Sequence, residues 1–246
     1  MVEQVCSLAV DKDGTMFVGT ESAFYSMSPA GRLALIAGSE HEKGYRDGQG
    51  SEARFNIPRD LAVDRDGSLI VADTYNNRLR RVSAMGTVST IAGSGEAGRF
   101  DGIGPAARFN RPRGISLDVH GTIYISDHLN HCIRKVTPAN GMVSTLCGSL
   151  QSEEGFVDAV GADARFHFPT GISLDTDANL IVADYGNHCI RKVSTCNGRV
   201  ITVAGSRAGQ TSSLRSHRLV AESLVIRMAG SKVARTSSLR PYRPVA

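Results

Sequence analysis

The sequence repeats itself along most of its length, and this repetition constrains the fold more than any other feature. The tetrad Ala-Arg-Phe-Asn occurs at 53–56 and 107–110, and Ala-Arg-Phe-His occurs at 164–167. An aspartate stands eight residues before each phenylalanine, and a proline stands three residues after it. Such self-similarity is typical of proteins in which each unit buries its apolar face against the next unit. The chain is therefore expected to be an array of similar units.

The similarity continues after each tetrad. The segments that align are residues 61–82, 115–136 and 172–193. Each unit closes with a Thr-apolar-small-Gly-Ser segment, as at 90–94. A weaker copy begins the chain, where residues 8–20 resemble residues 61–73 but Thr20 replaces the final aspartate. The sequence predicts one repeat domain over residues 1–206, with approximate units 1–39, 40–94, 95–149 and 150–206.

Each unit holds four short β-type runs separated by turn signals. In the second unit the predicted strands are residues 60–64, 68–72, 78–83 and 88–92. Asp66-Gly67 and Asn76-Asn77 lie in connections that are short enough for antiparallel neighbours. Adjacent side chains of the second strand point to opposite faces but are all apolar, so this strand must be covered on both sides. Four-stranded units covered on both faces predict the blades of an all-β propeller.

A tripeptide at the turn before the third strand suggests a family. Asn130-His131-Cys132 and Asn187-His188-Cys189 hold equivalent positions, and Asn76-Asn77-Arg78 stands there in the second unit. With the surrounding pattern they resemble the NHL repeat, a β-propeller blade named after Asn-His-Leu. The resemblance covers about 200 of the 246 residues. NHL proteins typically form six-bladed propellers, so the resemblance implies either a four-bladed propeller or part of a six-bladed ring.

The charge of the chain is unevenly distributed. The 28 basic and 24 acidic residues give a net charge of +4. Residues 207–246 contain eight basic residues and one acidic residue, so this tail carries +7 and residues 1–206 carry −3. The tail breaks the repeat and is expected to be a poorly ordered basic segment, with a short helix near 216–228 as the alternative.

An aspartate, an asparagine and an arginine recur at one spacing around the end of the second strand. They are Asp73, Asp127 and Asp184, then Asn76, Asn130 and Asn187, then Arg80, Arg134 and Arg191. A carboxylate, an amide and a guanidinium at this spacing are able to satisfy one another and the turn backbone, so a structural role is expected. A ring of aspartates that binds a cation or a polar ligand is the alternative.

Other recurring residues suggest packing and ion pairs. The tetrad phenylalanines are expected to wedge between blades. The expected ion pairs join Arg54, Arg108 and Arg165 to Asp47, Asp101 and Asp158. His131-Cys132 and His188-Cys189 contain metal-ligating residue types, but their spacing does not match a zinc site. The Asp-Gly pairs lack the dense oxygen ligands of a calcium loop, so no metal and no cofactor are expected.

Two functional classes compete with a binding module. Some propellers that resemble this one are lyases or lactonase-like hydrolases, but the chain has no Gly-x-Ser-x-Gly motif and no catalytic residue is assigned. Some animal NHL propellers bind RNA through a basic face, and Arg78, Arg80 and Arg81 would contribute to one here. The −3 charge of the repeat domain and the few aromatic residues beside these positions weaken the RNA interpretation.

The favoured interpretation is a non-enzymatic scaffold that presents one face to a protein partner. The loops after the second strands vary on a repeated frame, and the predicted contact residues are Thr74, Tyr75, His128, Leu129, Tyr185 and Gly186. Self-association is expected if the ring is incomplete. The N-terminus lacks the pattern of a signal peptide and no long apolar run is present, so no membrane association is expected. The odd number of five cysteines favours a reducing, cytoplasmic compartment.

Overall fold

The computed structural model describes residues 4–205, which form four antiparallel β-sheets in succession along the chain. The first sheet contains β1 (Ser7–Val10), β2 (Met16–Gly19), β3 (Ala23–Met27) and β4 (Leu33–Gly38). The second contains β5 (Gly48–Gln49), β6 (Asp60–Val63), β7 (Leu69–Asp73), β8 (Arg78–Val82) and β9 (Thr87–Ala92). The third contains β10 (Gly102–Ile103), β11 (Pro112–Leu117), β12 (Ile123–Asp127), β13 (Cys132–Val136) and β14 (Met142–Gly148). The fourth contains β15 (Pro169–Leu174), β16 (Leu180–Asp184), β17 (Cys189–Val193) and β18 (Val200–Gly205).

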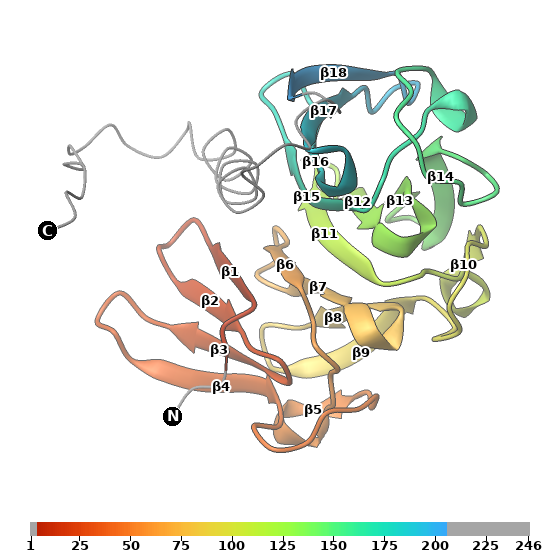
Figure 1. The fold of residues 1–246 in the computed structure, drawn as a ribbon. Helices are drawn as coiled ribbons and strands as arrows, with labels where there is room; N and C mark the ends of the chain where they lie inside the picture. Colours follow the sequence, from red (N-terminus) through yellow and green to blue (C-terminus); the bar gives the residue numbers. More distant parts are fainter. Residues whose placement is uncertain (1–3, 206–246) are drawn as a thin grey trace, which may run out of the picture.

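The sheets are consecutive blades of a propeller, and the predicted all-β propeller fold with four blades is confirmed. Figure 1 shows them side by side along an arc, from the first sheet in red to the fourth in blue. The first long strand of each sheet lies innermost, and β1 contacts β6, β6 contacts β11, and β11 contacts β15. Each blade is a meander from this inner strand outward.

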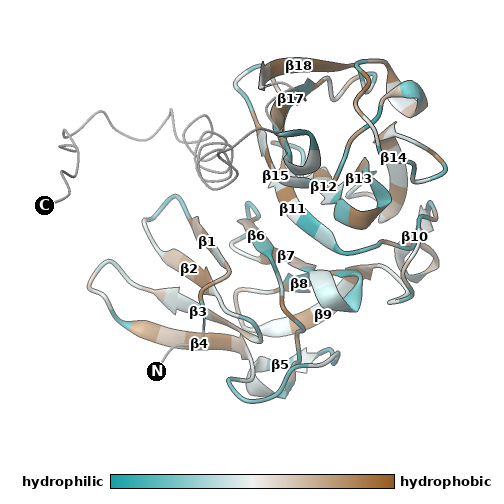
Figure 2. Ribbon diagram, viewed as in Figure 1, coloured by the Kyte–Doolittle hydropathy of each residue, from teal (hydrophilic) through white to brown (hydrophobic). Residues whose placement is uncertain are grey.

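The second strand of each of the last three blades is enclosed on both faces. Every residue of β7, β12 and β16 is buried. Figure 2 shows hydrophobic residues along the strands and hydrophilic ones in many connections. The continuous apolar run that predicted two covered faces is thus explained by a neighbouring blade or loop on each side.

The tetrad phenylalanines wedge between blades, as the sequence predicts. Phe55 is fully buried in a cluster that contains Phe24 and Ala37 of the first sheet and Val71 of the second. The rings of Phe24 and Phe55 meet edge to face at 4.8 Å. Phe109 and Phe166 occupy the corresponding clusters at the next two junctions. Aromatic side chains contribute large apolar areas, so these wedges add a large apolar contact at each of these junctions.

The hairpin between the first and second strands uses the turn residues that its backbone requires. In the second blade, Asp64 N donates to the carbonyl oxygen of Ser68 at 2.8 Å. Gly67 has a φ of 79°, in the left-handed region that glycine adopts without strain. In the fourth blade Ala178 stands at this place with a φ of 60°. The Asp-Gly signal in the sequence therefore marks a true turn.

Two kinds of short element were absent from the sequence prediction. The two-residue strands β5 and β10 add a fifth strand at the outer edge of the second and third sheets, where they pair with β9 and β14. Short 3-10 helices also occur: η1 (Gly50–Glu52), η2 (Thr74–Asn76), η3 (Gly104–Ala106), η4 (His128–Asn130), η5 (Gly161–Asp163) and η6 (Tyr185–Asn187). Elements of two or three residues are too short to produce a hydrophobic period.

The expected basic tail, residues 207–246, lies outside the described residues. Within residues 4–205, no helix is long and apolar enough to cross a membrane.

Replacing the wedge Phe109 by alanine should destabilise the protein by about 3–5 kcal/mol, because the ring is fully buried between two blades. The matched control is Phe100→Ala, which removes the same side chain from a position that is 58% exposed. Chemical denaturation followed by circular dichroism measures both changes. Equal losses of stability in the two variants would contradict the wedge role.

Candidate functional site

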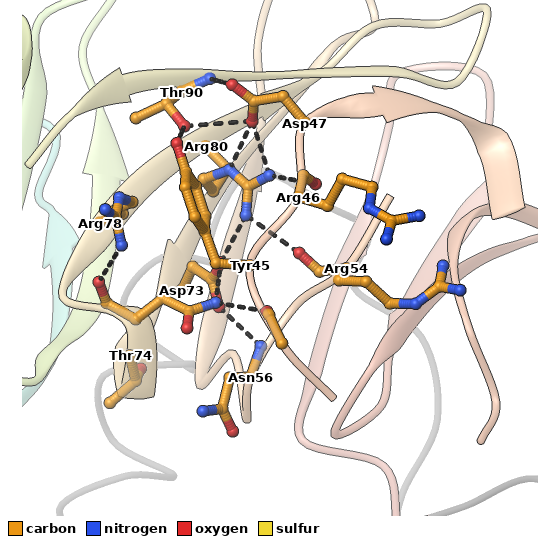
Figure 3. Close-up of polar contacts among 12 residues, drawn as sticks. Tyr45, Arg46, Asp47, Arg54, Asn56, Asp73, Thr74, Arg78, Arg80 and Thr90 are labelled. Carbon is orange, nitrogen blue, oxygen red and sulfur yellow. Dashed lines mark hydrogen bonds and ion pairs between the residues drawn. The ribbon is translucent and has the colours of Figure 1, made fainter. Parts of the chain in front are cut away.

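A buried arginine joins two aspartates in the second blade, as Figure 3 shows. Arg80, on β8, donates from Nη1 to Oδ2 of Asp73 and from Nη2 to Oδ1 of Asp47, each at 2.7 Å. The side chains of Arg80 and Asp73 are fully buried, whereas that of Asp47 is 42% exposed. Charge-assisted hydrogen bonds are among the stronger polar contacts in proteins. This Asp–Arg–Asp unit ties the end of β7 to the start of β5.

The same arginine holds the backbone of the linker that carries the wedge. Arg80 donates to the carbonyl oxygens of Arg46 at 2.8 Å and Arg54 at 3.1 Å. Asp47 accepts from the backbone nitrogen and the hydroxyl of Thr90, on β9, both at 3.1 Å. The linker is thereby fastened to the two outer strands of its own blade, which fixes the position of the wedge phenylalanine.

The third and fourth blades contain the same unit. The equivalent contacts join Arg134 to Asp127 and Asp101, and Arg191 to Asp184 and Asp158. The nitrogen–oxygen distances lie between 2.6 and 2.8 Å. In each blade one aspartate is fully buried and the other is partly exposed. The unit is therefore a repeated structural element.

The recurring asparagine adds a further hydrogen bond to the buried carboxylate. Asn76 Nδ2 donates to Oδ2 of Asp73 at 2.9 Å and to the carbonyl oxygen of Gly44 at 2.7 Å. The backbone nitrogen of Asn56 donates to Oδ1 of Asp73 at 2.9 Å. Both oxygens of this buried carboxylate thus have protein donors, as a buried charge requires.

The middle residue of the tripeptide adopts a left-handed backbone conformation and accepts a hydrogen bond from the next blade, and these two requirements explain which residue types occur there. Asn77 and His131 follow η2 and η4 in the left-handed conformation, with φ of 52° and 54°. Each also accepts a hydrogen bond from the next blade, Asn77 from Arg111 N at 2.9 Å and His131 from Phe168 N at 3.1 Å. The position therefore favours a side chain that accepts a hydrogen bond and tolerates a positive φ. His188 adopts the same conformation, with a φ of 56°.

The predicted ion pairs of the tetrad arginines were wrong. Arg54, Arg108 and Arg165 pair with Glu42, Glu96 and Glu153 at 2.7, 2.6 and 3.2 Å. The aspartates expected as their partners are held by the buried arginines of the third strands instead. The reason is geometric, because the linker folds back over its blade and brings Asp47 next to a residue 33 positions away.

Burial dominates the electrostatics of the fully buried aspartates. Desolvation raises the pKa of Asp73, Asp127 and Asp184, and the charge of the paired arginine opposes this increase. Their oxygens are engaged by arginine, asparagine and backbone donors. Within residues 4–205, no three His, Cys, Asp or Glu side chains form a group that could hold a metal ion. The arrangement holds the blade together and offers no reactive carboxylate.

The first blade lacks the unit. Thr20 stands at the position of the buried aspartate and accepts a hydrogen bond from Ala23 N at 3.2 Å. Tyr25 is paired with Val18 across β2 and β3, as Arg80 is paired with Val71 across β7 and β8, so Tyr25 stands at the position of the buried arginine. Its hydroxyl donates to Glu40 at 2.7 Å. A smaller polar network thus closes this blade.

Six segments of the second to fourth blades meet at the end of the propeller where the second strands finish, and we call them the loop face. They are residues 56–59, 74–77, 110–113, 128–131, 167–170 and 185–188. Backbone hydrogen bonds join them in pairs, such as Leu129 N to Asn110 O at 3.0 Å and Gly186 N to His167 O at 2.7 Å. The two segments that each of these blades contributes to the loop face are thus fixed to each other by backbone hydrogen bonds.

A pocket of about 300 Å³ opens on the loop face between the third and fourth blades. It is lined by Arg113, His128, Leu129, Phe168 and Tyr185. Three residues predicted from the sequence as partner contacts, His128, Leu129 and Tyr185, are therefore brought together. The ring of Phe168 lies 5.2 Å from that of His128.

The other three predicted contact residues lie elsewhere. Tyr75 is exposed, and the guanidinium of Arg111 stacks over its ring at 3.5 Å. Thr74 is buried, and its hydroxyl donates to the carbonyl oxygen of Pro112 in the next blade at 2.7 Å. Gly186 is closely packed, since a Cβ at this position would lie 2.5 Å from the ring of His167. Only Tyr75 among these three presents a large side chain to solvent.

The pocket disfavours a proton on His128. Burial, together with the charges of Arg113 and His131, lowers the pKa of His128 to about 4. Hydrogen bonding to the carbonyl oxygen of Pro169, 3.1 Å from Nδ1, acts in the opposite direction. At neutral pH the imidazole of His128 therefore lines the pocket in its uncharged form, and its Nδ1 donates to the carbonyl oxygen of Pro169.

Sequence reasoning missed Arg113 and Phe168. Both flank the proline that follows each tetrad, and the flanking positions differ between units: Ile57 and Arg59, Arg111 and Arg113, Phe168 and Thr170. The proline is the same in all three units and its neighbours differ, just as the loops after the second strands differ between constant residues. This difference between units was therefore a signal that could have identified the two positions. The pocket itself is built from two repeats, so alignment of single units does not reveal it.

A family model decides the classification. The model described as NHL repeat matches residues 55–81, 109–136 and 166–193. The chain belongs to the NHL-repeat family. The three matches fall on the second, third and fourth blades, whose Asp–Arg–Asp units the first blade lacks.

Curated relatives of this NHL protein are much longer. The human NHL repeat-containing protein 2 is 33% identical over 70% of this chain and 25% of its own length. Protein suppressor of quenching 1, chloroplastic, from Arabidopsis thaliana is 25% identical over 68% of this chain and 17% of its own length. The NHL chain thus spans about a quarter or less of these relatives.

Solved structures share the fold of the NHL chain. A streptogramin B lyase superposes with a TM-score of 0.58 and 14% identity, over 83% of this chain and 56% of that one. An auxiliary nutrient binding protein from Bacteroides thetaiotaomicron gives a TM-score of 0.63 and 18% identity, over 81% and 48%. At these identities the similarity concerns the fold alone.

Replacing Arg134 by methionine should destabilise the protein by about 3–5 kcal/mol, because it leaves the buried Asp127 without its counter-charge. Lys135→Met changes the next residue of the same strand, whose side chain is not fully buried, and serves as the control. Urea denaturation measures both variants. A loss in Arg134→Met no larger than in Lys135→Met would exclude the structural role of the unit.

The contribution of His128 to stability should fall as the pH decreases from about 6.5 to 4, because unfolded His128 binds a proton in this range and folded His128, with its pKa of about 4, does not. Burial raises the pKa of Asp60 to about 7, which contributes in the opposite direction over the same range, so the effect of His128 is measured as a difference between variants. His128→Asn retains a donor for the carbonyl oxygen of Pro169 but does not titrate. Its loss of stability between pH 7.5 and 5 should be smaller than that of the wild type by up to about 2 kcal/mol. His120→Asn, at an exposed turn, is the control. Identical pH profiles for the wild type and His128→Asn would refute the expectation.

Proposed function

We propose that this NHL propeller is a protein-interaction module that binds a protein partner through its loop face and has no catalytic role. The observation that carries the proposal is the constant frame with side chains that vary between blades, of which Tyr75, Leu129 and Tyr185 are exposed. In each of three blades the buried aspartate and the asparagine three residues later keep the same contacts. Between them stand different pairs, Thr74-Tyr75, His128-Leu129 and Tyr185-Gly186.

The exposed side chains on this frame are of the types that dominate protein interfaces. Tyr75, Leu129 and Tyr185 are 42%, 37% and 41% exposed. Tyrosine and arginine are enriched among the residues that contribute most to binding at protein interfaces. Tyr75 with Arg111, and Tyr185 with Arg113, combine these types at two adjacent junctions. A rigid propeller adds little ordering entropy to the cost of binding.

Catalysis has less support. The recurring carboxylates Asp73, Asp127 and Asp184 are held by arginine and asparagine, and so they are not poised for proton transfer. The similarity to lyases rests on the fold, which does not determine activity.

The test is a binding comparison with matched surface variants of the full chain. The loop-face variant is Tyr75→Ala with Tyr185→Ala, and the control variant is Met85→Ala with Val119→Ala, at exposed turns on the opposite edge. Proteins captured by the wild type are purified and their affinities measured directly. The loop-face variant should bind about 30-fold or more weakly, and the control should bind as the wild type does. Unchanged affinity of the loop-face variant for every captured protein would reject the proposal.

A further inference from the structure

A second pocket, with a volume of about 280 Å³, opens between the second and third blades at the end of the strands opposite to the loop face. The hairpin before β7 and the hairpin before β12 both contribute to its rim, so we call it the hairpin pocket. Its apolar lining consists of Ile70, Ile91, Leu117, Ile123 and Val136. Concave sites with apolar walls and a few polar groups are the usual binding sites of small ligands.

The walls of the hairpin pocket recur at the two flanking junctions of the propeller. Ile91, Leu117, Ile123 and Val136 correspond by the repeat to Ile36, Val63, Leu69 and Val82 at the first junction and to Leu146, Leu174, Leu180 and Val193 at the third. All twelve side chains are aliphatic and pack in the corresponding apolar clusters. The walls alone therefore do not explain why the second junction has this pocket.

The residue under the pocket is what differs between junctions. Ile70 stands there on β7, whereas the equivalent residues are Phe17 on β2 and Tyr124 on β12. Phe17 and Tyr124 are only 9% and 3% exposed, and each packs against the next blade. An aromatic ring thus fills this place at both flanking junctions. Because an isoleucine side chain is shorter than an aromatic side chain, space for a ring remains above Ile70.

The third junction shows how the protein itself holds a phenol at this place. The hydroxyl of Tyr124 donates to Oδ2 of Asp118 at 3.4 Å. Nζ of Lys135 lies 6.0 Å from the centre of the tyrosine ring, which is within the range of a cation–π contact. The ring is thus enclosed by aliphatic walls, with one carboxylate at its hydroxyl and one cation near its face.

The second junction keeps these polar groups without the tyrosine. Asp64 and Arg81 are the equivalents of Asp118 and Lys135, and both line the hairpin pocket. Asp64 accepts from the backbone nitrogen of Arg65 with Oδ1 at 2.7 Å, and its Oδ2 lies 3.5 Å from Arg81. A carboxylate accepts about four hydrogen bonds, so these contacts leave Oδ2 able to accept one more.

We propose that the hairpin pocket binds a phenol, with the aromatic ring above Ile70 and the hydroxyl donated to Asp64. Such a ligand reproduces between the second and third blades the contacts that Tyr124 makes between the third and fourth. Cavities of about 150 Å³ with aliphatic walls already accept benzene, so the volume of the pocket is sufficient for one ring. The site lies at the other end of the blades from the loop face and is independent of the proposed function.

The first test is a titration of the full chain followed by methyl NMR. The probe is p-cresol, which has the ring and hydroxyl of tyrosine, and toluene is its twin without the hydroxyl. Saturating p-cresol should shift the methyl resonances of Ile70, Ile91 and Ile123, with a Kd of about 1 mM or lower. The methyl groups of Ile201, in the fourth blade, should not shift. Toluene should bind at least fivefold more weakly, because it makes no hydrogen bond to the carboxylate.

Two variants test the placement of the ring and of the hydroxyl. Ile70→Tyr inserts the ring that the third blade has, so it should weaken p-cresol binding at least tenfold, and Ile201→Tyr, at a position 41% exposed, is its control. Asp64→Ala should reduce the preference for p-cresol over toluene to less than twofold. Its control is Asp175→Ala, which removes the equivalent turn carboxylate from the fourth blade. Circular dichroism melting curves establish that each variant is folded, and the Asp64 pair decides the matter if Ile70→Tyr is not.

A short peptide distinguishes the two sources of a phenol. Acetyl-Gly-Tyr-Gly-amide should bind as tightly as p-cresol if the ligand is a tyrosine of another protein, and more weakly if the ligand is a free aromatic compound. Three results would overturn the inference: no saturable shift of the three isoleucines with either probe, equal affinities for p-cresol and toluene, or undiminished p-cresol binding in a folded Ile70→Tyr variant. Each of them leaves the function proposed for the loop face untouched.

Discussion

A buried arginine that bridges two aspartates is the contact on which most of this fold depends. Arg80 and its equivalents connect the end of the second strand, the linker before the blade and, through the outer aspartate, the fourth strand. Burying charges is unfavourable unless each is paired and hydrogen-bonded, and here the partners are complete around the inner carboxylate. The arginine therefore fixes where the linker runs and where the wedge phenylalanine enters the preceding blade.

The same unit makes a functional surface possible. The inner aspartate and the asparagine hold both ends of the short 3-10 helix, and the two residues between them are free to change from blade to blade. Thr74 and His128 illustrate the limit of this freedom, since both reach a proline carbonyl of the next blade. A rigid frame with a few variable positions resembles other scaffolds in which loops carry function.

Parts of the structure that depend on local spacing were accessible from the sequence. Asp73, Asn76 and Arg80 lie within one turn and two adjacent strands, so their recurrence at fixed distances was informative. The pairing of Asp47 with Arg80 was not, because it crosses 33 residues of chain whose path no periodicity describes. The pocket also eluded prediction, since Arg113 and Phe168 belong to different repeats and meet only when two blades pack. Strands of two residues, such as β5, leave no pattern at all.

The wedge has a consequence for how the protein is made. Ala92, at the end of the second sheet, is fully buried in the cluster that contains Phe109, which follows it by 17 residues. During synthesis, the apolar edge of a newly emerged sheet therefore stays exposed until the beginning of the next repeat has also been synthesised. Folding on the ribosome would advance in one direction and trail synthesis by part of a blade. The order of the repeats in the chain is thus also the order in which the propeller is able to close.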